Sequence, residues 1–230
     1  MKLFHVTSPV KVSEDRDLFF AQPVTFETFK LAKEFSAPSL SVEQCTVQFE
    51  EDCEVVPSHI RILDNLLGSI LDLGDFAYKY PFMKEILDIT YNNSVGYDYI
   101  VFSHVDISLM PYFYNSVLEL INKGHDAIII NRRSIADRFK TKDDLPLMWA
   151  EVGEIHPGWD CFVFKRNLYP KFNLEKGVIG AVSSGRILFY NLMFHSEQLL
   201  ELKNSHLTFH LGFSPTTTRQ YADKNWIKVN

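Results

Sequence analysis

The chain of 230 residues contains only three cysteines, Cys45, Cys53 and Cys161, and no two of them form a CxxC pair. An odd number of separated cysteines argues against a disulfide framework and for a reducing compartment. The sequence therefore predicts free, buried thiols and a cytoplasmic protein.

The sequence also lacks a hydrophobic N-terminal leader and an uninterrupted apolar run of about 18 residues. We therefore expect no secretory signal and no transmembrane segment. A peripheral membrane contact stays open. A basic block is missing as well. The net charge is −6, and close basic pairs such as Arg132-Arg133 and Lys165-Arg166 are too sparse for a nucleic-acid interface. We expect no nucleic-acid partner.

The chain has enough apolar residues for a full core, since 46% are hydrophobic and 14% aromatic. Strand and helix patterns alternate, and no repeat or Gly/Ser-rich linker divides the chain. We predict a single α/β domain over residues 1–230, with a mostly parallel, twisted central sheet flanked by helices. Residues 1–133 form a part suited to one ligand, and residues 134–230 form a smaller part suited to another.

The pattern predicts the following elements. Strands are expected at 2–6, 41–49, 60–63, 99–103, 127–130, 161–164 and 207–211. Helices are expected after Pro23 with Thr25 as N-cap, from Pro81 onwards, and at 111–123 and 187–202. Segment 134–155 suits a surface excursion or a short irregular helix.

The most informative segment is 99–108, where a strand-like apolar run ends in His104 and Asp106 shortly before Pro111. Ligands collect beyond the carboxyl ends of strands in open α/β sheets. A histidine and a carboxylate in that place suit a divalent cation and the anion that the cation holds. The alternative is an ordinary turn in which Asp106 caps the next helix. These residues alone leave both interpretations open.

A second cluster is the segment His-Pro-Gly-Trp-Asp at 156–160. Pro157 and Gly158 predict a sharp bend, with Asp160 at the mouth of the next strand beside Trp159. An indole face next to a carboxylate is a common way to bind a sugar, because the ring packs on C–H groups and the acid takes hydroxyl protons. Asp160 is also a candidate general base. The alternative is a turn carboxylate, with Trp159 covering the core.

The third cluster surrounds His210, which lies within an apolar strand near the end of the regular structure. Such a histidine is commonly a neutral core residue bonded to a carbonyl, and it needs a partner to act as a ligand. Together with His104, His156 and Asp106 it could supply a mixed nitrogen and oxygen site for Mn²⁺ or a similar ion. Spacing alone does not show whether these side chains converge.

These segments and the order of elements resemble the small glycosyltransferases of the GT-A fold. The resemblance covers residues 1–212, and its segments are Val6-Thr7-Ser8-Pro9, 97–107, 129–133, 156–160 and Phe209-His210-Leu211-Gly212. In that family a strand ends in an Asp-x-Asp motif whose acids hold a divalent metal, Mn²⁺ or Mg²⁺, on the diphosphate of a nucleotide sugar. This sequence has His104-Val105-Asp106 instead.

The resemblance implies a role for each matching residue. Asp106 corresponds to the final acid of the motif, which binds the metal directly, and His104 replaces the first acid, which binds the ribose or the metal. His210 corresponds in chain order to a late histidine that is a metal ligand in some GT-A enzymes. The nucleotide of a donor such as a UDP-sugar is expected near Thr7, Ser8 and Pro9, with Arg132 or Arg133 on its phosphates. Surface ion pairs are the alternative for both arginines.

The implied reaction moves a sugar from a nucleotide-diphosphate sugar to a glycan or other hydroxyl acceptor. An inverting reaction needs a base on the opposite face, for which Asp160 is the candidate and His156 its substitute, with Trp159 in the sugar-binding wall. Two other functions stay open. A metal-dependent hydrolase would need more ligands in tighter sets. A non-catalytic sugar- or nucleotide-binding domain would explain the departure from Asp-x-Asp.

Overall fold

The computed structural model describes residues 1–181 and 184–212. The α-helices are α1 (Asp17–Glu34), α2 (Met83–Asn93), α3 (Phe113–Asn122), α4 (Leu145–Ala150) and α5 (Gly185–His195). The strands are β1 (Lys2–Thr7), β2 (Ser41–Thr46), β3 (Arg61–Ile62), β4 (Tyr99–Ser103), β5 (Ser108–Leu109), β6 (Ala127–Ile135), β7 (Glu154–Lys165), β8 (Leu199–Leu202) and β9 (Thr208–Leu211). Short 3₁₀ helices are η1 (Glu50–Val55), η2 (Ile70–Leu73), η3 (Lys142–Asp144) and η4 (Arg166–Lys171).

The strands of the described residues form one sheet, in the order β3-β2-β1-β4-β7-β6-β9-β5, with β8 paired to β6 beside this path. Strands β1 to β4 are parallel to one another, as β8 and β9 are to β6. Strand β7 runs antiparallel to β4 and β6, and β5 runs antiparallel to β9. The predicted single α/β domain is confirmed, with a sheet that is mixed because β7 is inserted between the two parallel groups.

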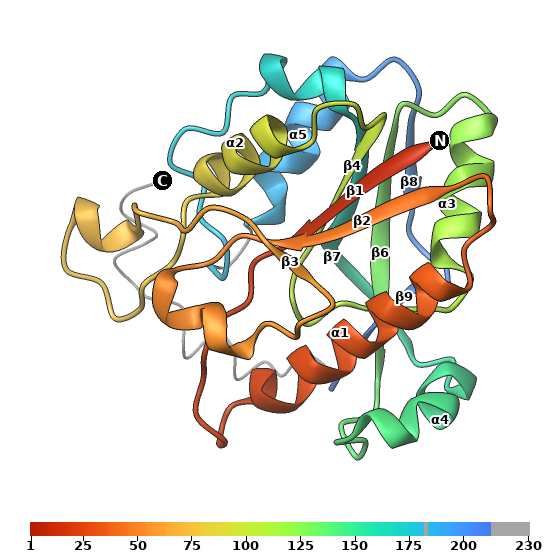
Figure 1. Cartoon of the computed structure of the whole chain (residues 1–230), viewed down its shortest axis with the longest axis horizontal. Helices are drawn as coiled ribbons and strands as arrows, with labels where there is room; N and C mark the ends of the chain where they lie inside the picture. The colour runs from red at the N-terminus through yellow and green to blue at the C-terminus, as the bar shows by residue number, and fades with distance from the viewer. Residues whose placement is uncertain (182–183, 213–230) are drawn as a thin grey trace.

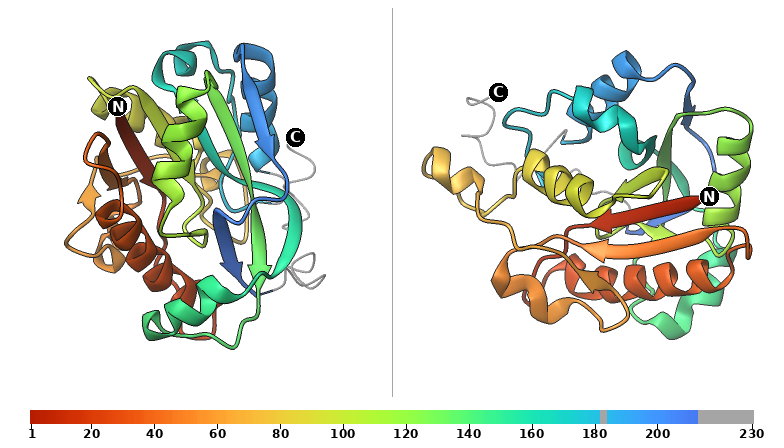
Figure 2. Two further views of the ribbon diagram at one scale, coloured as in Figure 1. Left: turned by 90° about the vertical axis from the view of Figure 1, so that its right-hand side faces the viewer. Right: turned by 45° about the horizontal axis from the view of Figure 1, so that its top comes forward.

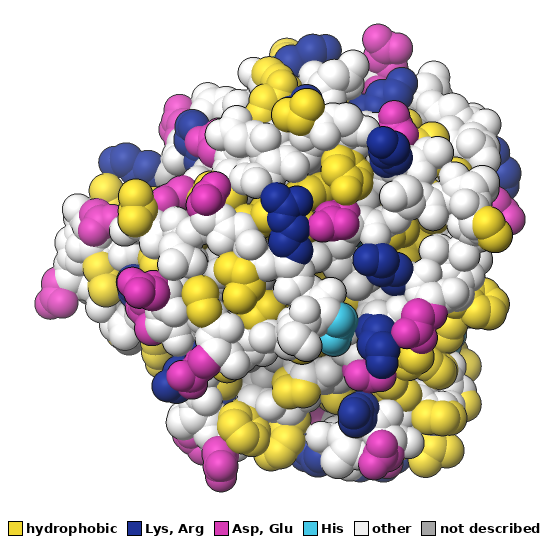
Figure 3. Space-filling model, in the orientation of Figure 1, with side chains coloured by type: hydrophobic (Ala, Val, Ile, Leu, Met, Phe, Trp, Pro, Cys, Tyr) yellow, Lys and Arg dark blue, Asp and Glu magenta, His cyan; other side chains and the backbone are white. Residues whose placement is uncertain are grey.

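Helices cover both faces of the sheet (Figures 1 and 2). One face, which includes Phe102 and Phe162, packs against α2 and α5. The other face, which includes Val101 and Val163, packs against α1 and α3. Neighbouring residues of β4 and β7 thus enter opposite cores, as the period of a strand buried on both faces requires. On the face drawn in Figure 3, Lys/Arg and Asp/Glu side chains are interspersed.

The expected start of the first helix was wrong. Helix α1 begins at Asp17 and contains Pro23, and Thr25 is a buried helical residue rather than its N-cap. A proline inside a helix leaves the carbonyl four residues earlier without its partner. That carbonyl belongs to Phe19, which lies in the first turn and is 40% exposed, so it can turn towards water.

The expected helix over 187–202 ends early. Helix α5 stops at His195, and the chain continues into β8, which pairs with β6. The carboxylate of Asp126 accepts the N–H groups of Glu197 and Gln198, at 2.9 and 2.8 Å. These bonds come from a residue distant in sequence, so the local pattern could not reveal them. Segment 134–155 contains the expected short helix, α4, after η3.

Candidate active site

The carboxyl end of β4 carries the turn that holds His104 and Asp106. The N–H of Ile107 donates to the carbonyl of His104 at 3.2 Å, which closes the turn. Val105, between the two polar residues, is buried in a small apolar cluster. Because Val105 enters the core, its neighbours stay partly accessible, with the side chains of His104 and Asp106 exposed at 18% and 25%.

The β6–β7 pair is irregular where it passes this turn. The ladder pairs Ile130 with Cys161 and then Asn131 with Trp159. Asp160 is therefore the extra residue of a β-bulge, a feature that redirects a side chain. The carbonyl of Asp160 accepts the N–H of His104 at 3.0 Å, which joins the bulge to the turn after β4.

A second shift between Asn131 and Arg133 leaves Arg132 and residues 156–158 outside the regular ladder. We expected a bend here with Asp160 at the mouth of a strand, and this was wrong, because the whole segment lies inside β7. Strands accept a proline at a bulge, where no ladder hydrogen bond is lost. Irregular pairing thus places Arg132 and His156 beside Asp160.

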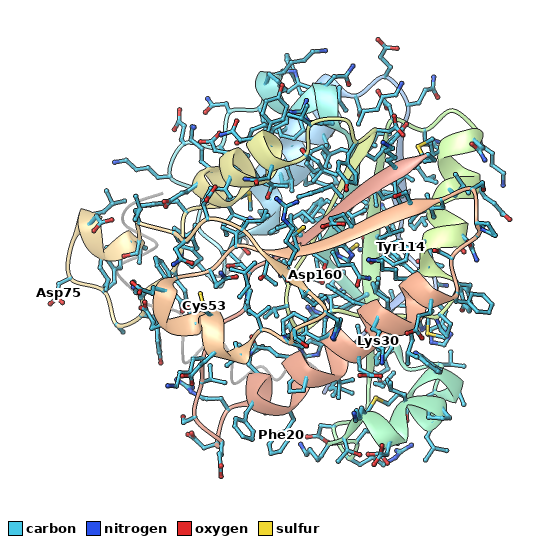
Figure 4. The ribbon with its side chains drawn as sticks, in the orientation of Figure 1. Phe20, Lys30, Cys53, Asp75, Tyr114 and Asp160 are labelled. Carbon is cyan, nitrogen blue, oxygen red and sulfur yellow. The ribbon has the colours of Figure 1, made fainter. Side chains whose placement is uncertain are left out.

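Asp160 lies at the centre of this cluster and is labelled in Figure 4. Its Oδ1 atom is 3.0 Å from Nη1 of Arg132 and 3.5 Å from Nδ1 of His104. Its Oδ2 atom is 3.9 Å from Nδ1 of His156. Oδ2 is buried and accepts no hydrogen bond from the described residues. The arginine therefore stabilises the carboxylate through one oxygen, while the other oxygen is left without a hydrogen-bond donor among the described residues.

The structure brings His210 to Asp106. Nε2 of His210 lies 3.2 Å from Oδ2 of Asp106, and Nδ1 lies 3.0 Å from the carbonyl oxygen of Gly212. A carbonyl oxygen only accepts hydrogen bonds, so Nδ1 carries a proton. Nε2 and the carboxylate then need either a second proton or a metal cation between them. The bond to Gly212 agrees with the alternative of a histidine bonded to a carbonyl, and Asp106 is the partner that a ligand role requires, so His210 as a metal ligand stays a prediction.

Two pKa shifts define the charges of this region. Burial raises the pKa of Asp106, but the hydrogen bond from His210 and the charges of His210, Arg132 and His104 outweigh burial and hold this pKa well below its usual range. Burial and the charge of Arg132 lower the pKa of His156, against the opposing effect of Asp160. Asp106 is therefore ionised at neutral pH, and His156 is neutral, with its Nδ1 accepting the backbone N–H of Gly158 at 2.9 Å.

Asp106 and His210 form a donor set that fits a divalent cation. A carboxylate oxygen and an imidazole nitrogen suit Mn²⁺ and related ions, and metal-binding histidines commonly donate their other N–H to a backbone carbonyl. Among the described residues no group of three or more His, Cys, Asp or Glu side chains could hold a metal. A site with two protein ligands therefore needs further oxygens, which substrate phosphates commonly supply for Mg²⁺.

The residues predicted to bind the nucleotide lie at the carboxyl end of β1, which is the parallel neighbour of β4. Thr7 is buried and pairs with Thr46 of β2, and neither hydroxyl has a hydrogen-bond partner among the described residues. Ser8 is half-buried and Pro9 is buried. Because β1 and β4 are parallel, these residues lie at the same edge of the sheet as the turn that holds Asp106.

The structure does not place Arg133 with the other candidates. Its guanidinium donates to the carbonyl oxygens of Val152 and Gly153 and to Oδ1 of Asn204. These contacts tie two loops together beside β6. Of the two adjacent arginines, only Arg132 joins the cluster around Asp160.

Trp159 makes mainly structural contacts. Its ring stacks on Phe189 of α5 at a centroid distance of 4.2 Å, and its Nε1 donates to Oε1 of Glu201 at 2.8 Å. The side chain packs against the core cluster and is half-buried. The core-covering interpretation describes these contacts, and the sugar-binding role of Trp159 stays a prediction.

Two polar residues of this region escaped the sequence interpretation. Asn131 is buried, donates to the carbonyl of His156 at 3.4 Å, and leaves its Oδ1 without a hydrogen-bond partner among the described residues. Its signal was available, since it is a polar residue directly after a run of four apolar ones. Glu201, which orients Trp159, lay in a segment expected to be helical and had no such signal.

No family model matches this chain, and no curated protein matches it in sequence. Solved structures do match. Residues 1–349 of S. aureus TarS in complex with UDP-GlcNAc give a TM-score of 0.55 at 8% identity, over 94% of this chain and 60% of that one. The TarS complex with UDP gives a TM-score of 0.54 at 9% identity, over 92% of this chain and 61% of that one.

Glucosyl-3-phosphoglycerate synthase from M. tuberculosis, in complex with phosphoglyceric acid, gives a TM-score of 0.51 at 14% identity, over 95% of this chain and 74% of that one. The chain has a GT-A-like fold. It spans about three-fifths of the length of the TarS chains that it matches. Within the described part of this GT-A-like chain, no helix has the length and apolar character needed to cross a membrane.

Proposed function

We propose that this protein is a glycosyltransferase that moves a sugar from a nucleotide-diphosphate sugar to a hydroxyl acceptor, with a divalent metal and with inversion at the anomeric carbon. The observation that carries the proposal is the Asp106–His210 pair, which lies close to the Asp160 cluster at the carboxyl end of β4. In a GT-A-like fold this edge of the sheet is where ligands bind.

Asp106 and His210 would hold Mn²⁺ or Mg²⁺ on the donor diphosphate. The ion, when bound, stabilises as a Lewis acid the negative charge that develops on the leaving diphosphate. Thr7, Ser8 and Pro9 would contact the nucleotide. His104 would contact the ribose, since its Nε2 is buried and has no hydrogen-bond partner among the described residues.

Asp160 is the proposed general base. The acceptor oxygen forms a bond to the anomeric carbon, the bond from that carbon to the diphosphate oxygen breaks, and Oδ2 of Asp160 takes the hydroxyl proton. Arg132 supports this role, because its guanidinium lies 3.0 Å from Oδ1 and so fixes the carboxylate through the oxygen that does not take the proton. His156, which is neutral, would take the proton if Asp160 does not. The acceptor would be a glycan or another molecule with an accessible hydroxyl.

UDP-sugars are the first donors to test, because the matching TarS structures contain UDP-GlcNAc and UDP. The thermal stability of the protein with Mn²⁺ would be measured across a panel of nucleotide sugars. A ligand at 100 times its Kd stabilises by about 2.7 kcal/mol, which this assay detects readily. Metal-dependent release of nucleoside diphosphate from the selected donor then separates an enzyme from a binding domain.

The matched control is Asp88→Asn, which alters a carboxylate of α2 that binds Tyr169 away from the site. We expect Asp106→Asn to lose the metal-dependent stabilisation and Asp88→Asn to keep it. Binding of no nucleotide sugar, or equal binding by both variants, would contradict the proposal.

A further inference from the structure

The turn that carries Asp106 is held at both ends by buried hydroxyl groups on the side of the sheet covered by α1 and α3. Ser103 comes directly before the turn, and Ser108 and Leu109 follow it. All three residues are at most 1% exposed. Ser103 and Ser108 bond through their hydroxyls, and Leu109 through its N–H, to side chains of β1 and α1 that lie outside the proposed site. Their backbones also pair in the β4–β7 and β5–β9 ladders, and the Leu109 carbonyl accepts Nε1–H of Trp149 at 3.2 Å.

The first anchor is a directional chain of hydrogen bonds that ends at Ser103. Nε2 of Gln44 donates to the hydroxyl oxygen of Tyr114 at 3.0 Å and to the carbonyl of Phe29 at 2.6 Å. The hydroxyl of Tyr114 lies 2.7 Å from Nδ1 of His5, and Nε2 of His5 lies 2.9 Å from Oγ of Ser103.

The direction of this chain follows from counting donors. The amide nitrogen of Gln44 can only donate, so the proton of the Tyr114 hydroxyl has one acceptor in this network, Nδ1 of His5. His5 must then carry its proton on Nε2 and donate it to Ser103. A neutral histidine is required, which agrees with burial lowering the pKa of His5 to about 3. The hydroxyl of Ser103 is thereby held by a ring that cannot rotate without breaking two bonds.

The second anchor comes from α1. Oγ1 of Thr28 donates to the carbonyl of Thr25 at 2.7 Å and accepts the backbone N–H of Leu109 at 3.0 Å. Oγ1 of Thr25 lies 3.1 Å from Oγ of Ser108. Both threonines are fully buried. Helix α1 therefore supplies two side-chain contacts to the residues that follow the turn.

Polar groups in such a core carry a cost that apolar side chains of similar size would avoid. The polar side chains of both anchors contact residues that flank the same turn. The turn itself has a single internal hydrogen bond, from the N–H of Ile107 to the carbonyl of His104. We infer that His5, Thr25 and Thr28 are positioning residues, which hold the turn so that Asp106 faces His210. The turn's proposed role as a metal-binding element rests on the proposed function, whereas its rigidity does not.

The test uses one variant for each anchor and a matched control for each. Thr28→Val removes the acceptor for Leu109, and Thr90→Val is its control, because Thr90 is also fully buried and donates to the carbonyl of Ile86 in α2 at 2.7 Å. Ser103→Ala removes the partner of His5. Ser94→Ala is its control, since Ser94 is fully buried and accepts a hydrogen bond from Arg166 at 3.0 Å.

Amide hydrogen exchange at His104, Ile107 and Leu109 is measured by NMR without ligand, and Mn²⁺-dependent binding of UDP is measured by calorimetry. We expect Thr28→Val and Ser103→Ala to accelerate exchange at these amides, and to weaken metal-dependent binding, by at least about fivefold relative to their controls. This is the factor that a hydrogen bond of ordinary net strength supplies.

Equal exchange in each variant and its control would overturn the inference, since the hydroxyls would then contribute only to general stability. Accelerated exchange with unchanged metal-dependent binding would overturn the link to Asp106. If the wild-type protein binds no nucleoside diphosphate, the proposed function fails, and hydrogen exchange still decides whether the hydroxyls hold the turn.

Discussion

Nε2 of His210 lies 3.2 Å from Oδ2 of Asp106, although β9 and the turn after β4 come from different halves of the chain. His210 is fixed in β9 by its pairing with Ser134 of β6, and the turn that carries Asp106 leads into β5, which pairs with β9. Their contact therefore depends on the register of the sheet.

If these two residues share one cation, the losses of affinity caused by replacing each of them will not be additive. We expect Asp106→Asn and His210→Gln each to lose at least about tenfold in Mn²⁺-dependent UDP affinity, which is about 1.4 kcal/mol, and the double variant to lose little more. Calorimetry with and without Mn²⁺ measures this, with His195→Gln as the control histidine. Additive losses would mean that the two side chains act separately.

Asp160→Asn tests the general base. We expect transfer to fall by about 10² to 10⁴ fold with nearly unchanged affinity for the donor, because the amide keeps the size of the side chain but cannot take the proton. Single-turnover transfer at saturating donor measures the rate, and NMR of the product gives its anomeric configuration. Near wild-type transfer with inverted product would exclude Asp160 and direct the search to His156.

The Arg132–Asp160 ion pair predicts a loss of stability. Both side chains are about nine-tenths buried, so Arg132→Met leaves a buried carboxylate without its arginine and should lower the free energy of unfolding by about 3–5 kcal/mol. Arg138→Met is the control, because Arg138 pairs with Glu151 while 67% exposed and should cost less than about 1 kcal/mol. Urea unfolding measures both, and equal costs would refute the buried ion pair.

His5 predicts a specific dependence of stability on pH. Burial lowers its pKa from 6.5 to about 3, so between these values the unfolded chain binds a proton that the folded protein does not. Stability should therefore fall by about 1.4 kcal/mol for each pH unit below 6.5 through this residue alone. Urea unfolding from pH 7 to 4 should show a smaller loss in His5→Gln than in the wild type or in His59→Gln. Equal dependence of stability on pH in the wild type and in His5→Gln would contradict a neutral His5.

Trp159→Phe separates the two interpretations of the indole. Phenylalanine keeps an aromatic ring for stacking on Phe189 but loses the hydrogen bond to Glu201. A sugar-binding role predicts a raised acceptor KM with unchanged nucleotide affinity and only a small loss of stability. A purely structural role predicts lower stability with normal kinetics of the folded protein.

Much of the fold could be predicted from the sequence. The apolar runs that became β4 and the first half of β6 have the composition of strands buried on both faces, so they are recognisable without any partner. The position of Asp106 directly beyond β4 followed from the same run. The errors came where a distant residue determines the local structure, as Asp126 does when it accepts the N–H groups that follow α5.

By itself, the sequence determined the α/β class, the strand that is followed by His104 and Asp106, and the strand that contains His210, because hydrophobic periodicity is a local property. Only the tertiary structure decided which of these side chains meet. The bulge that turns Asp160 towards His104, and the choice of Arg132 over Arg133, depend on register shifts between β6 and β7. Register is set by pairing between residues far apart in the chain, and a shift of one residue moves a side chain to the other face.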